Sequence, residues 1–275
     1  MRLIRHVGEA RPPVRPRVIA EGEFDGLHLG HQRVLAAVVA RARALHGEAS
    51  VLLHRHSGDA ARLTDLREQL EGLAAAGVDT AVLTRSNAAA DALQRLVPSV
   101  YVTGRAAPAS VPPASVETVA AVMAGSEPIS AAAIRSALAA GDLAAAHALL
   151  GRDPDVSGRI VHGFHRGAPL GIPTANIRVR GVQLPPDGVY AVRAQIGGRP
   201  LRGVANLGFN PTFGNRTRSI ETHLLDFSGD IYGARLRIAF VARLRGEQKF
   251  AGIDALLAQI RADIAAARRL FERDE

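Results

Sequence analysis

The sequence predicts a fold in two parts: an α/β part with a parallel sheet, followed by a small antiparallel β-barrel with a terminal helix. In the first half, strand-like apolar runs alternate with segments of helical periodicity, which indicates parallel strands joined by crossover helices. The second half changes to short strands with tight turns and ends in one amphipathic helix. We expect a domain of residues 1–152 and a domain of residues 153–275.

Strands and helices are expected in alternation through the first half. The helix at 32–45 is predicted from its apolar face, and Asp142 and Gly151 stand where a helix at 143–150 would have its N-cap and its C-terminal glycine. Residues 106–115 are rich in Ala and Pro and are expected to be irregular. The expected strands are 18–20, 50–53, 78–83 and 99–103, and the expected helices are 32–45, 65–76, 88–96, 130–139 and 143–150.

Five strands and one helix are expected in the second half. The helix at 253–272 carries an apolar stripe that we interpret as a surface for packing rather than for ligand contact. The expected strands are 156–162, 188–196, 201–206, 219–226 and 235–244, and the stripe consists of Ile253, Leu257, Ile260, Ile264 and Phe271.

Composition excludes several classes of protein. The chain has 275 residues, enough for one or two domains with sizeable cores. Its apolar runs are short and interrupted, so we expect no membrane span, and residues 1–17 lack the apolar core of a secretory signal. Without cysteine there is no disulfide and no thiolate nucleophile or ligand. We expect a cytoplasmic protein, either a monomer or a weak homo-oligomer.

The net charge of +8 raises the question of a nucleic-acid partner. The arginines are dispersed along the chain, Lys249 is the only lysine, and the aromatic residues form no stacking series. An anionic small substrate explains the charge equally well, so we expect no nucleic-acid partner.

A glycine-rich loop in the second half is a candidate phosphate site. Gly163, Gly167 and Gly171 recur at four-residue intervals after a strand-like run, so the backbone can turn tightly and present N–H groups. Thr174 then supplies a hydroxyl and Asn176 an amide oxygen, which are neutral donors suited to a magnesium-bound triphosphate. The alternative is that the loop is simply a turn.

A carboxylate that could complete this site is Glu221. Period-two alternation places it on the face of a strand opposite Ile220, Thr222 and Leu224. The alternative is an ordinary solvated side chain.

A second motif, EGEFDGLHLGH at 21–31, lies between the first expected strand and helix. His28 and His31 flank Gly30 at a helix start, where side chains, N–H groups and the helix dipole can hold phosphate oxygens. Zinc binding is a rival interpretation that lacks a third and fourth ligand at a recognisable spacing. A purely structural turn is the other alternative.

The second half contains an ordered series of motifs: GRIVHG at 158–163, RG at 166–167, LGIPTANI at 170–177, LPPDGVYAV at 184–192, GVANLG at 203–208, NPTFG at 210–214 and ETHLLDF at 221–227. Over about residues 154–273 the chain resembles the riboflavin kinase module of the bacterial bifunctional riboflavin kinase/FAD synthetases. The resemblance implies a six-stranded Greek-key barrel with a helix packed against it.

The same resemblance implies roles for individual residues. Thr174 and Asn176 would contact Mg²⁺ and phosphates, Gly163, Gly167 and Gly171 would shape the nucleotide loop, and Glu221 would be the general base toward the terminal alcohol of riboflavin. Asn206, Asn210 and Arg243 are weaker candidates, for which polar turn or surface roles are equally compatible with the sequence.

The motif at 21–31 resembles the His-x-Gly-His signature of nucleotidylyltransferases, and specifically the FAD synthetase module that precedes the kinase in the same family. Other signatures of that module are altered. Glu23 stands where Asn is usual, LHRHS at 53–57 replaces an FDPHP-like string, SAAAIR at 130–135 replaces SSTxIR, and GRAAP at 104–108 replaces a glycine followed by an acidic-aromatic pair.

These departures remove polar groups where phosphates would be contacted. Because losing one preorganised donor can cost about 10²-fold in rate, we expect residues 1–152 to be a degenerate nucleotidylyltransferase-like module. His28, Gly30, His31 and Arg135 are expected to keep weak nucleotide binding.

We therefore expect a riboflavin kinase that transfers the γ-phosphate of ATP to riboflavin with Mg²⁺ and gives FMN. One alternative is a fully bifunctional enzyme that continues to FAD. The other is a noncatalytic flavin- or RNA-binding regulator, which would not need to keep Thr174, Asn176 and Glu221.

Overall fold

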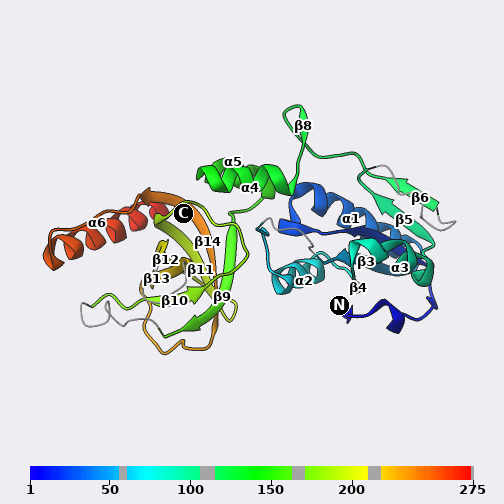
Figure 1. Ribbon diagram of the computed structural model, residues 1–275, viewed down its shortest axis with the longest axis horizontal. Helices are drawn as coiled ribbons and strands as arrows, with labels where there is room; N and C mark the ends of the chain where they lie inside the picture. Colours follow the sequence, from blue (N-terminus) through cyan, green and yellow to red (C-terminus); the bar gives the residue numbers. More distant parts are fainter. Residues whose placement is uncertain (56–60, 106–114, 163–170, 210–217, 274–275) are drawn as a thin grey trace. The chain divides into compact units, whose positions relative to one another are not determined.

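The structure is a computed structural model that describes residues 1–55, 61–105, 115–162, 171–209 and 218–273 (Figure 1). The chain forms two compact units. The first unit is Met1–Ile134 with Leu149–Gly151, and the second is Arg135–Ala148 with Arg152–Glu275. The two-part fold class predicted from the sequence is confirmed.

The first unit is built on a six-stranded sheet with the order β1-β4-β3-β2-β5-β6, in which every neighbouring pair is parallel. Its strands are β1 (Arg2–Ile4), β2 (Arg17–Gly22), β3 (Glu48–His54), β4 (Thr80–Thr84), β5 (Val100–Thr103) and β6 (Ser115–Thr118). A short hairpin follows, β7 (Met123–Ala124) with β8 (Glu127–Pro128).

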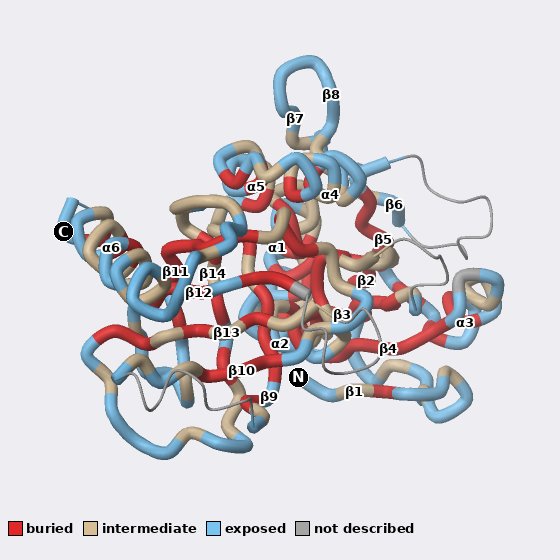
Figure 2. The backbone as a smooth tube through the Cα atoms, turned by 60° about the vertical axis from the view of Figure 1, so that its left-hand side comes forward, coloured by how far each residue is buried: buried red, intermediate tan, exposed pale blue. Residues whose placement is uncertain are grey.

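Helices cover both faces of this sheet. The helices α1 (Leu29–Ala44) and α2 (Leu66–Ala75) bury apolar residues on one face, and α3 (Ala89–Leu96) does so on the other. Three short 3₁₀ turns, Val7–Glu9, Asp25–Leu27 and Ser86–Ala88, lie between these elements. The strands β2 to β5 are buried almost throughout, as Figure 2 shows, because helices on both faces leave no side of a parallel sheet in water.

Local sequence signals explain where several helices begin and end. Asp65 and Glu68 form a reciprocal capping box at the start of α2. The N-cap predicted at Asp142 is confirmed, since its Oδ1 accepts from Ala145 N at 2.9 Å at the start of α5 (Leu143–Leu150). Gly151 follows α5 with a left-handed φ of +73°, as expected for a helix-ending glycine. The preceding helix is α4 (Ala131–Ala140).

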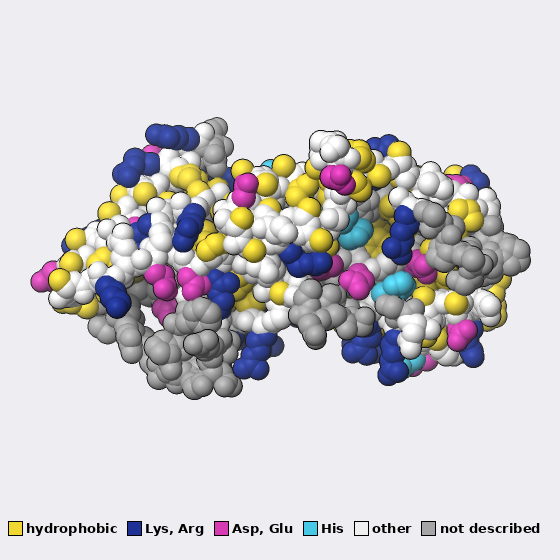
Figure 3. All heavy atoms as spheres, turned by 45° about the horizontal axis from the view of Figure 1, so that its top comes forward, with side chains coloured by type: hydrophobic (Ala, Val, Ile, Leu, Met, Phe, Trp, Pro, Cys, Tyr) yellow, Lys and Arg dark blue, Asp and Glu magenta, His cyan; other side chains and the backbone are white. Residues whose placement is uncertain are grey.

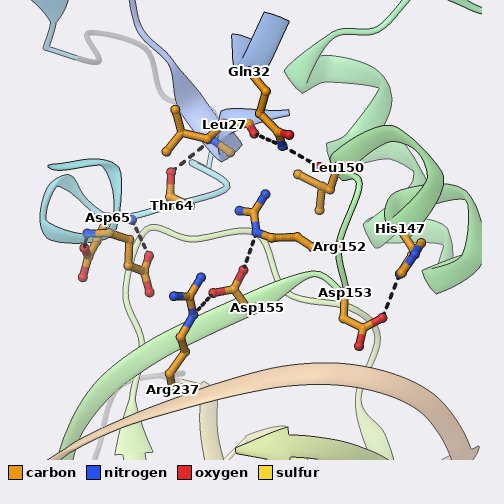
Figure 4. A network of polar contacts seen from close by, with 12 residues as sticks. Leu27, Gln32, Thr64, Asp65, His147, Leu150, Arg152, Asp153, Asp155 and Arg237 are labelled. Atoms are coloured by element: carbon orange, nitrogen blue, oxygen red, sulfur yellow. Dashed lines mark hydrogen bonds and ion pairs between the residues drawn. The ribbon is translucent and has the colours of Figure 1, made fainter. Parts of the chain in front are cut away.

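Polar contacts on either side of Gly151 hold the chain within each unit (Figure 4). In the first unit, Nε2 of Gln32 donates to Leu27 O at 2.9 Å and to Leu150 O at 3.0 Å. In the second unit, Asp155 accepts from Arg152 and from Arg237. The first residues of the barrel are thereby fixed by charge as well as by strand pairing.

The second unit is a closed barrel with the order β10-β13-β12-β11-β14-β9. Its strands are β9 (Asp155–Val161), β10 (Ala175–Arg178), β11 (Gly188–Ile196), β12 (Arg199–Phe209), β13 (Arg218–Leu224) and β14 (Arg235–Arg245). Tyr190 and Phe240 fill the interior with an edge-to-face contact at 5.3 Å. The helix α6 (Ile253–Glu272) lies on the outside, where Ala267 and Phe271 pack on Val189, Ala191 and Val204.

Some elements differ from those predicted. The strand β10 was not predicted, because its four residues follow a Gly and Pro stretch that is typical of a turn. The edge strands β1 and β6 and the β7–β8 hairpin were also not predicted. Most of the connection expected at 106–115 lies outside the described residues.

Charged side chains of both signs are interspersed over the face in Figure 3. Among the described residues, no helix combines the length and the apolar character needed to cross a membrane.

Candidate active sites

The second unit contains a cavity of about 670 Å³ between the outer face of the barrel and α6. Strand pairing brings three polar residues side by side: Asn176 on β10 pairs with Glu221 on β13, and Glu221 pairs with Asn206 on β12. Ile220, Thr222 and Leu224 are buried while Glu221 is only half-buried, which confirms the predicted alternation. Glu221 and Asn206 both line the cavity.

Thr174 connects this cavity to a second one. It lines the large cavity and also a smaller cavity of about 240 Å³ formed by the loop after β13 and the start of β10. Nδ2 of Asn176 approaches the backbone oxygen of Thr174 at 3.4 Å and its hydroxyl at 3.5 Å. The hydroxyl and the amide predicted as donors are therefore adjacent, next to Glu221 in the sheet. Gly163 and Gly167 lie outside the described residues, and Gly171 is exposed with a φ of +73°.

The smaller cavity presents an aromatic wall. Tyr232 lines it, and the Tyr232 ring stacks on His162 with ring centroids 4.0 Å apart. Phe227 and Ile231 add apolar surface from the same loop. A flat aromatic and apolar wall of this kind suits a planar ring system.

Several residues of the large cavity were not assigned a role from sequence. His223 lies on the same face of β13 as Glu221, and its Nδ1 is 2.9 Å from Pro173 O, which ties the Thr174 segment to the strand. The segment after β14 contributes Glu247, Lys249 and Phe250. The alternation that placed Glu221 also places His223, whereas the segment at 247–250 has no periodic signal.

The apolar stripe of α6 packs on the barrel, as predicted, through Ile264 and Phe271, and part of it also borders the large cavity. Phe271 is buried against the barrel, but Ile260 and Ile264 line the large cavity. Arg243, a weak candidate from sequence, donates from Nη2 to Asp187 O at 2.7 Å and supports the turn before β11. Asn210 lies outside the described residues.

No group of three or more His, Asp or Glu side chains in the described part of the chain is placed to hold a metal ion. The candidate magnesium ligands Thr174 and Asn176 are adjacent and carry neutral oxygen donors. Such neutral oxygen donors suit magnesium, which retains several water or phosphate oxygens in its coordination shell.

In the first unit, the motif at 21–31 forms a sharp turn after β2 and the first turn of α1. Phe24 and Leu27 have positive φ angles of 48° and 45°. The buried carboxylate of Asp25 holds this turn, because it accepts from Leu63 N at 2.8 Å and from Thr64 N at 3.1 Å. The turn is thus braced by backbone donors from the segment before α2.

His28 and His31 are brought together at the start of α1. Their rings stack with centroids 3.6 Å apart, and Nδ1 of His28 accepts from His31 N at 3.3 Å as the N-cap. A Cβ at Gly30 would lie 3.1 Å from the His28 ring, so any larger residue would require this ring to shift. Burial lowers the pKa of His28 to about 4, and burial with the charge of His28 lowers the pKa of His31 to about 3.

These shifts fix the protonation of the pair at neutral pH. Both imidazoles are neutral, and since Nδ1 of His28 is an acceptor, its proton lies on Nε2. The side chain then offers an N–H donor beside the free N–H groups of the α1 N-terminus, which is an arrangement suited to phosphate oxygens.

Sequence comparisons show which family has both of these sites. A riboflavin kinase family model matches residues 150–271, and an FAD synthetase family model matches residues 11–102. The bifunctional riboflavin kinase/FMN adenylyltransferase of Escherichia coli strain K12 is 34% identical in an alignment that covers 98% of this chain and 98% of the relative. The chain belongs to this bifunctional family.

Other relatives agree over both halves. The bifunctional riboflavin kinase/FMN adenylyltransferase of Bacillus subtilis strain 168 is 32% identical, with 92% of each chain covered. A crystal structure described as a macrolide-efflux protein from Streptococcus pneumoniae superposes with a TM-score of 0.83 and 25% identity, covering 97% of this chain and 98% of that chain. Similarity to these two proteins therefore extends through both units.

The comparisons bear on the expectation that the first module is degenerate. Its relatives are named for both activities and match along almost the whole chain, so they favour the bifunctional alternative over a kinase with an impaired partner module.

The altered segment at 130–135 keeps a helix start, because Ser130 Oγ accepts from Ala133 N at 3.2 Å. Arg135 is half-buried on α4 and belongs to the second unit, whereas His28, Gly30 and His31 lie in the first.

Another altered position, His54, joins a buried polar cluster at the carboxyl ends of β2, β3 and β5. Its Nε2 lies 3.8 Å from Oε2 of Glu21, and their side chains are 12% and 5% exposed. Burial would raise the pKa of Glu21, but the neighbouring His54, the hydroxyl of Tyr101 and the charge of Arg105 lower it. Burial and the Glu21 carboxylate raise the pKa of Tyr101.

Glu23 is a further altered position. Its backbone oxygen accepts a 3.4 Å hydrogen bond from the side chain of Gln69.

Proposed function

We propose that this chain is a bifunctional enzyme, which phosphorylates riboflavin with ATP in the second unit and transfers AMP from ATP to the resulting FMN in the first. The observation that carries the proposal is the row formed by Asn176, Glu221 and Asn206, in which a carboxylate flanked by two amides opens on a cavity of about 670 Å³. The family relationship supports the second activity.

In the kinase reaction, the two cavities have different occupants. The larger cavity, with Val189, Phe250 and Ile260 on its walls, has the size and apolar surface for the flavin ring. The smaller cavity, with Tyr232, takes the nucleotide. Because Thr174 lines both, the ribityl alcohol and the γ-phosphate meet beside it, which supplies the alignment on which phosphoryl transfer depends.

The proposed base is Glu221, which takes the proton of the ribityl alcohol as the alcohol oxygen attacks the γ-phosphorus of ATP and the bond to the departing ADP breaks. Asn206 and Asn176 orient the alcohol and the phosphate from the neighbouring strands. Thr174 and Asn176 would hold magnesium, which when bound neutralises charge on the phosphates. His223 acts on Thr174 indirectly, through its contact with Pro173 O.

In the adenylyl-transfer reaction, His28 and His31 bind the phosphates of ATP at the N-terminus of α1. Neutral imidazoles donate N–H groups without repelling a magnesium-bound triphosphate. A kinase without the second activity is the other candidate, and the observation in its favour is the alanine triplet at 131–133 in the first turn of α4, which offers no hydroxyl donor.

A chromatographic assay tests both activities. Purified protein is incubated with riboflavin, ATP and magnesium, and riboflavin, FMN and FAD are separated over time; we expect FMN first and FAD later. FMN that accumulates without FAD would leave only the kinase. If Glu221→Gln still formed FMN at the wild-type rate, the proposed base would be wrong.

A further inference from the structure

A third cavity, of about 490 Å³, lies in the first unit. It is at the end of the sheet where the strands begin, opposite the end that carries the His28 motif. Its walls include Arg2 at the start of β1, Arg17 at the start of β2, Glu48 at the start of β3 and Asp79 just before β4. Because all four strands are parallel, these residues meet at the amino edge of the sheet, whereas the motif at 21–31 follows the carboxyl end of β2. We call this cavity the arginine cleft.

The arginine cleft has an excess of positive charge. Arg2, Arg11, Arg15 and Arg17 line it, against two carboxylates, Glu48 and Asp79, which leaves two positive charges uncompensated. A recessed site lined mainly by one sign of charge raises the local concentration of counter-ions.

Both carboxylates are already engaged by the protein. Glu48 accepts from Nη2 of Arg17 at 3.1 Å, is contacted by Arg2 at 3.6 Å and accepts from the Thr80 hydroxyl. Burial would raise the pKa of Glu48, but the Thr80 hydroxyl and the two arginines lower it, so the carboxylate stays charged. Oδ2 of Asp79 accepts from Ala49 N at 2.9 Å. Within the described residues, neither acid is paired with Arg11 or Arg15.

The segment that carries Arg11 and Arg15 is anchored to the sheet. Pro16 O accepts from Glu48 N at 2.8 Å, and it lies so close to Gly47 that a Cβ there would be 2.1 Å from the oxygen. Arg17 is 2% exposed and donates from Nη1 to Leu96 O at 2.8 Å, while its buried Nε has no partner among the described residues. Prolines at 12, 13 and 16 restrict the backbone that carries Arg11 and Arg15, whose side chains line the cleft.

We propose that the arginine cleft binds a phosphate-chain anion, with Arg11 and Arg15 as its ligands. Guanidinium groups bind phosphate oxygens through paired, charge-assisted N–H donors. No aromatic ring lines the cleft among the described residues, so it has no platform for a purine. The recognised group is therefore the phosphate chain itself, whether it comes as free inorganic polyphosphate or as the tail of a nucleotide.

Titration calorimetry in magnesium-free buffer with inorganic tripolyphosphate tests the proposal. Three proteins are compared: wild type, Arg11→Ala/Arg15→Ala, and Arg95→Ala/Arg261→Ala. The last variant removes two exposed arginines elsewhere and has the same net charge as the cleft variant. We expect the cleft variant to lose one binding site, or to bind there at least about tenfold more weakly, and the control to bind as wild type does. Arg11→Lys/Arg15→Lys, which keeps the charge but not the forked donors, should fall between them.

Three results would overturn the assignment. The first is that wild type binds no tripolyphosphate. The second is that Arg11→Ala/Arg15→Ala leaves tripolyphosphate binding unchanged. The third is that the cleft variant and the control variant lose binding equally, which would indicate an effect of net charge alone. Titration with ATP separates the two sources of the ligand. The component of binding that depends on Arg11 and Arg15 should have the same affinity for ATP and tripolyphosphate within about threefold, and a preference for ATP of more than about tenfold would contradict recognition of the phosphate chain alone.

Discussion

Arg245, the last residue of β14, donates from Nε to both carboxylate oxygens of Asp263 on α6, at 3.1 and 3.0 Å. Nη2 of the same arginine lies 2.9 Å from Oδ2, and the two side chains are only 15% and 6% exposed. Gln259, one turn earlier on α6, donates to Asp263 at 2.8 Å. Since α6 forms one wall of the large cavity, this buried pair fixes the distance between that wall and the barrel.

Removal of the carboxylate by Asp263→Ala should destabilise the second unit by about 3 kcal/mol, because it leaves the Arg245 guanidinium buried without its partner. Riboflavin binding should also weaken as α6 loosens. The control is Arg268→Ala, which breaks a second link from α6 to the barrel, to Asp226, whose side chain is 73% exposed. An exposed pair is screened by water and contributes much less than a buried one. Denaturant unfolding compares the two variants, and equal losses would contradict the role given to the buried pair.

Glu221→Gln tests the base of the proposed kinase. The amide keeps the shape of the side chain and loses its ability to accept a proton, so turnover to FMN should fall about 10²–10⁴-fold. Riboflavin affinity, measured by quenching of flavin fluorescence, should change by less than about threefold. Glu247→Gln in the same cavity is the matched control and should retain most of the activity. A larger loss in the Glu247 variant would transfer the role of base to that residue.

Thr174→Ala should weaken magnesium-dependent binding of ATP about tenfold, since it removes one hydroxyl that contacts a charged ligand. Thr174→Ser keeps the hydroxyl and should bind ATP as wild type does. Equilibrium dialysis of ATP with and without magnesium measures the effect. If the alanine variant bound ATP normally, or if the serine variant were equally impaired, the hydroxyl would not be a ligand.

Most helices and strands could be predicted from the sequence, because each has its own hydrophobic periodicity within a short segment. The strand at 188–196 and the helix at 253–272 were predicted with the bounds that the structure has. By contrast, β10 has only four residues, and its strand conformation depends on pairing with β9 and β13. Pairing of this kind joins residues far apart in sequence, and no local pattern records it.

The site could be predicted to a similar extent. Thr174, Asn176 and Glu221 stood out from their motifs, but the adjacency of Asn176, Glu221 and Asn206 follows only from the order of the barrel strands. Ile260 and Ile264 line the large cavity. Their periodicity does not predict this position, because an apolar helical stripe has the same pattern whether it faces a core or a ligand. The arginine cleft likewise depends on four strand starts meeting at one edge.

The lowered pKa values of His28 and His31, about 4 and about 3, predict how stability depends on pH. Both lie below the ordinary value of 6.5, so the neutral forms stabilise the fold fully above pH 6.5, and that contribution is lost as the pH falls below it. The loss approaches about 1.4 kcal/mol per pH unit for each fully buried histidine. Between pH 7.5 and pH 5.5 we expect the pair to contribute a loss of roughly 1–2 kcal/mol, after allowance for partial exposure.

Urea unfolding of wild type and of His28→Gln/His31→Gln at the two pH values isolates this effect, because other titrating groups contribute equally to both proteins. Glutamine has no charge to gain, so the double variant should lose less stability on acidification than wild type does. Above pH 7 the free energy of unfolding should change with pH equally in the two proteins. Equal pH dependence in both would mean that the histidines are as easily protonated in the folded protein as in the unfolded chain, and the neutral N–H donors assigned to the adenylyl-transfer site would then be wrong.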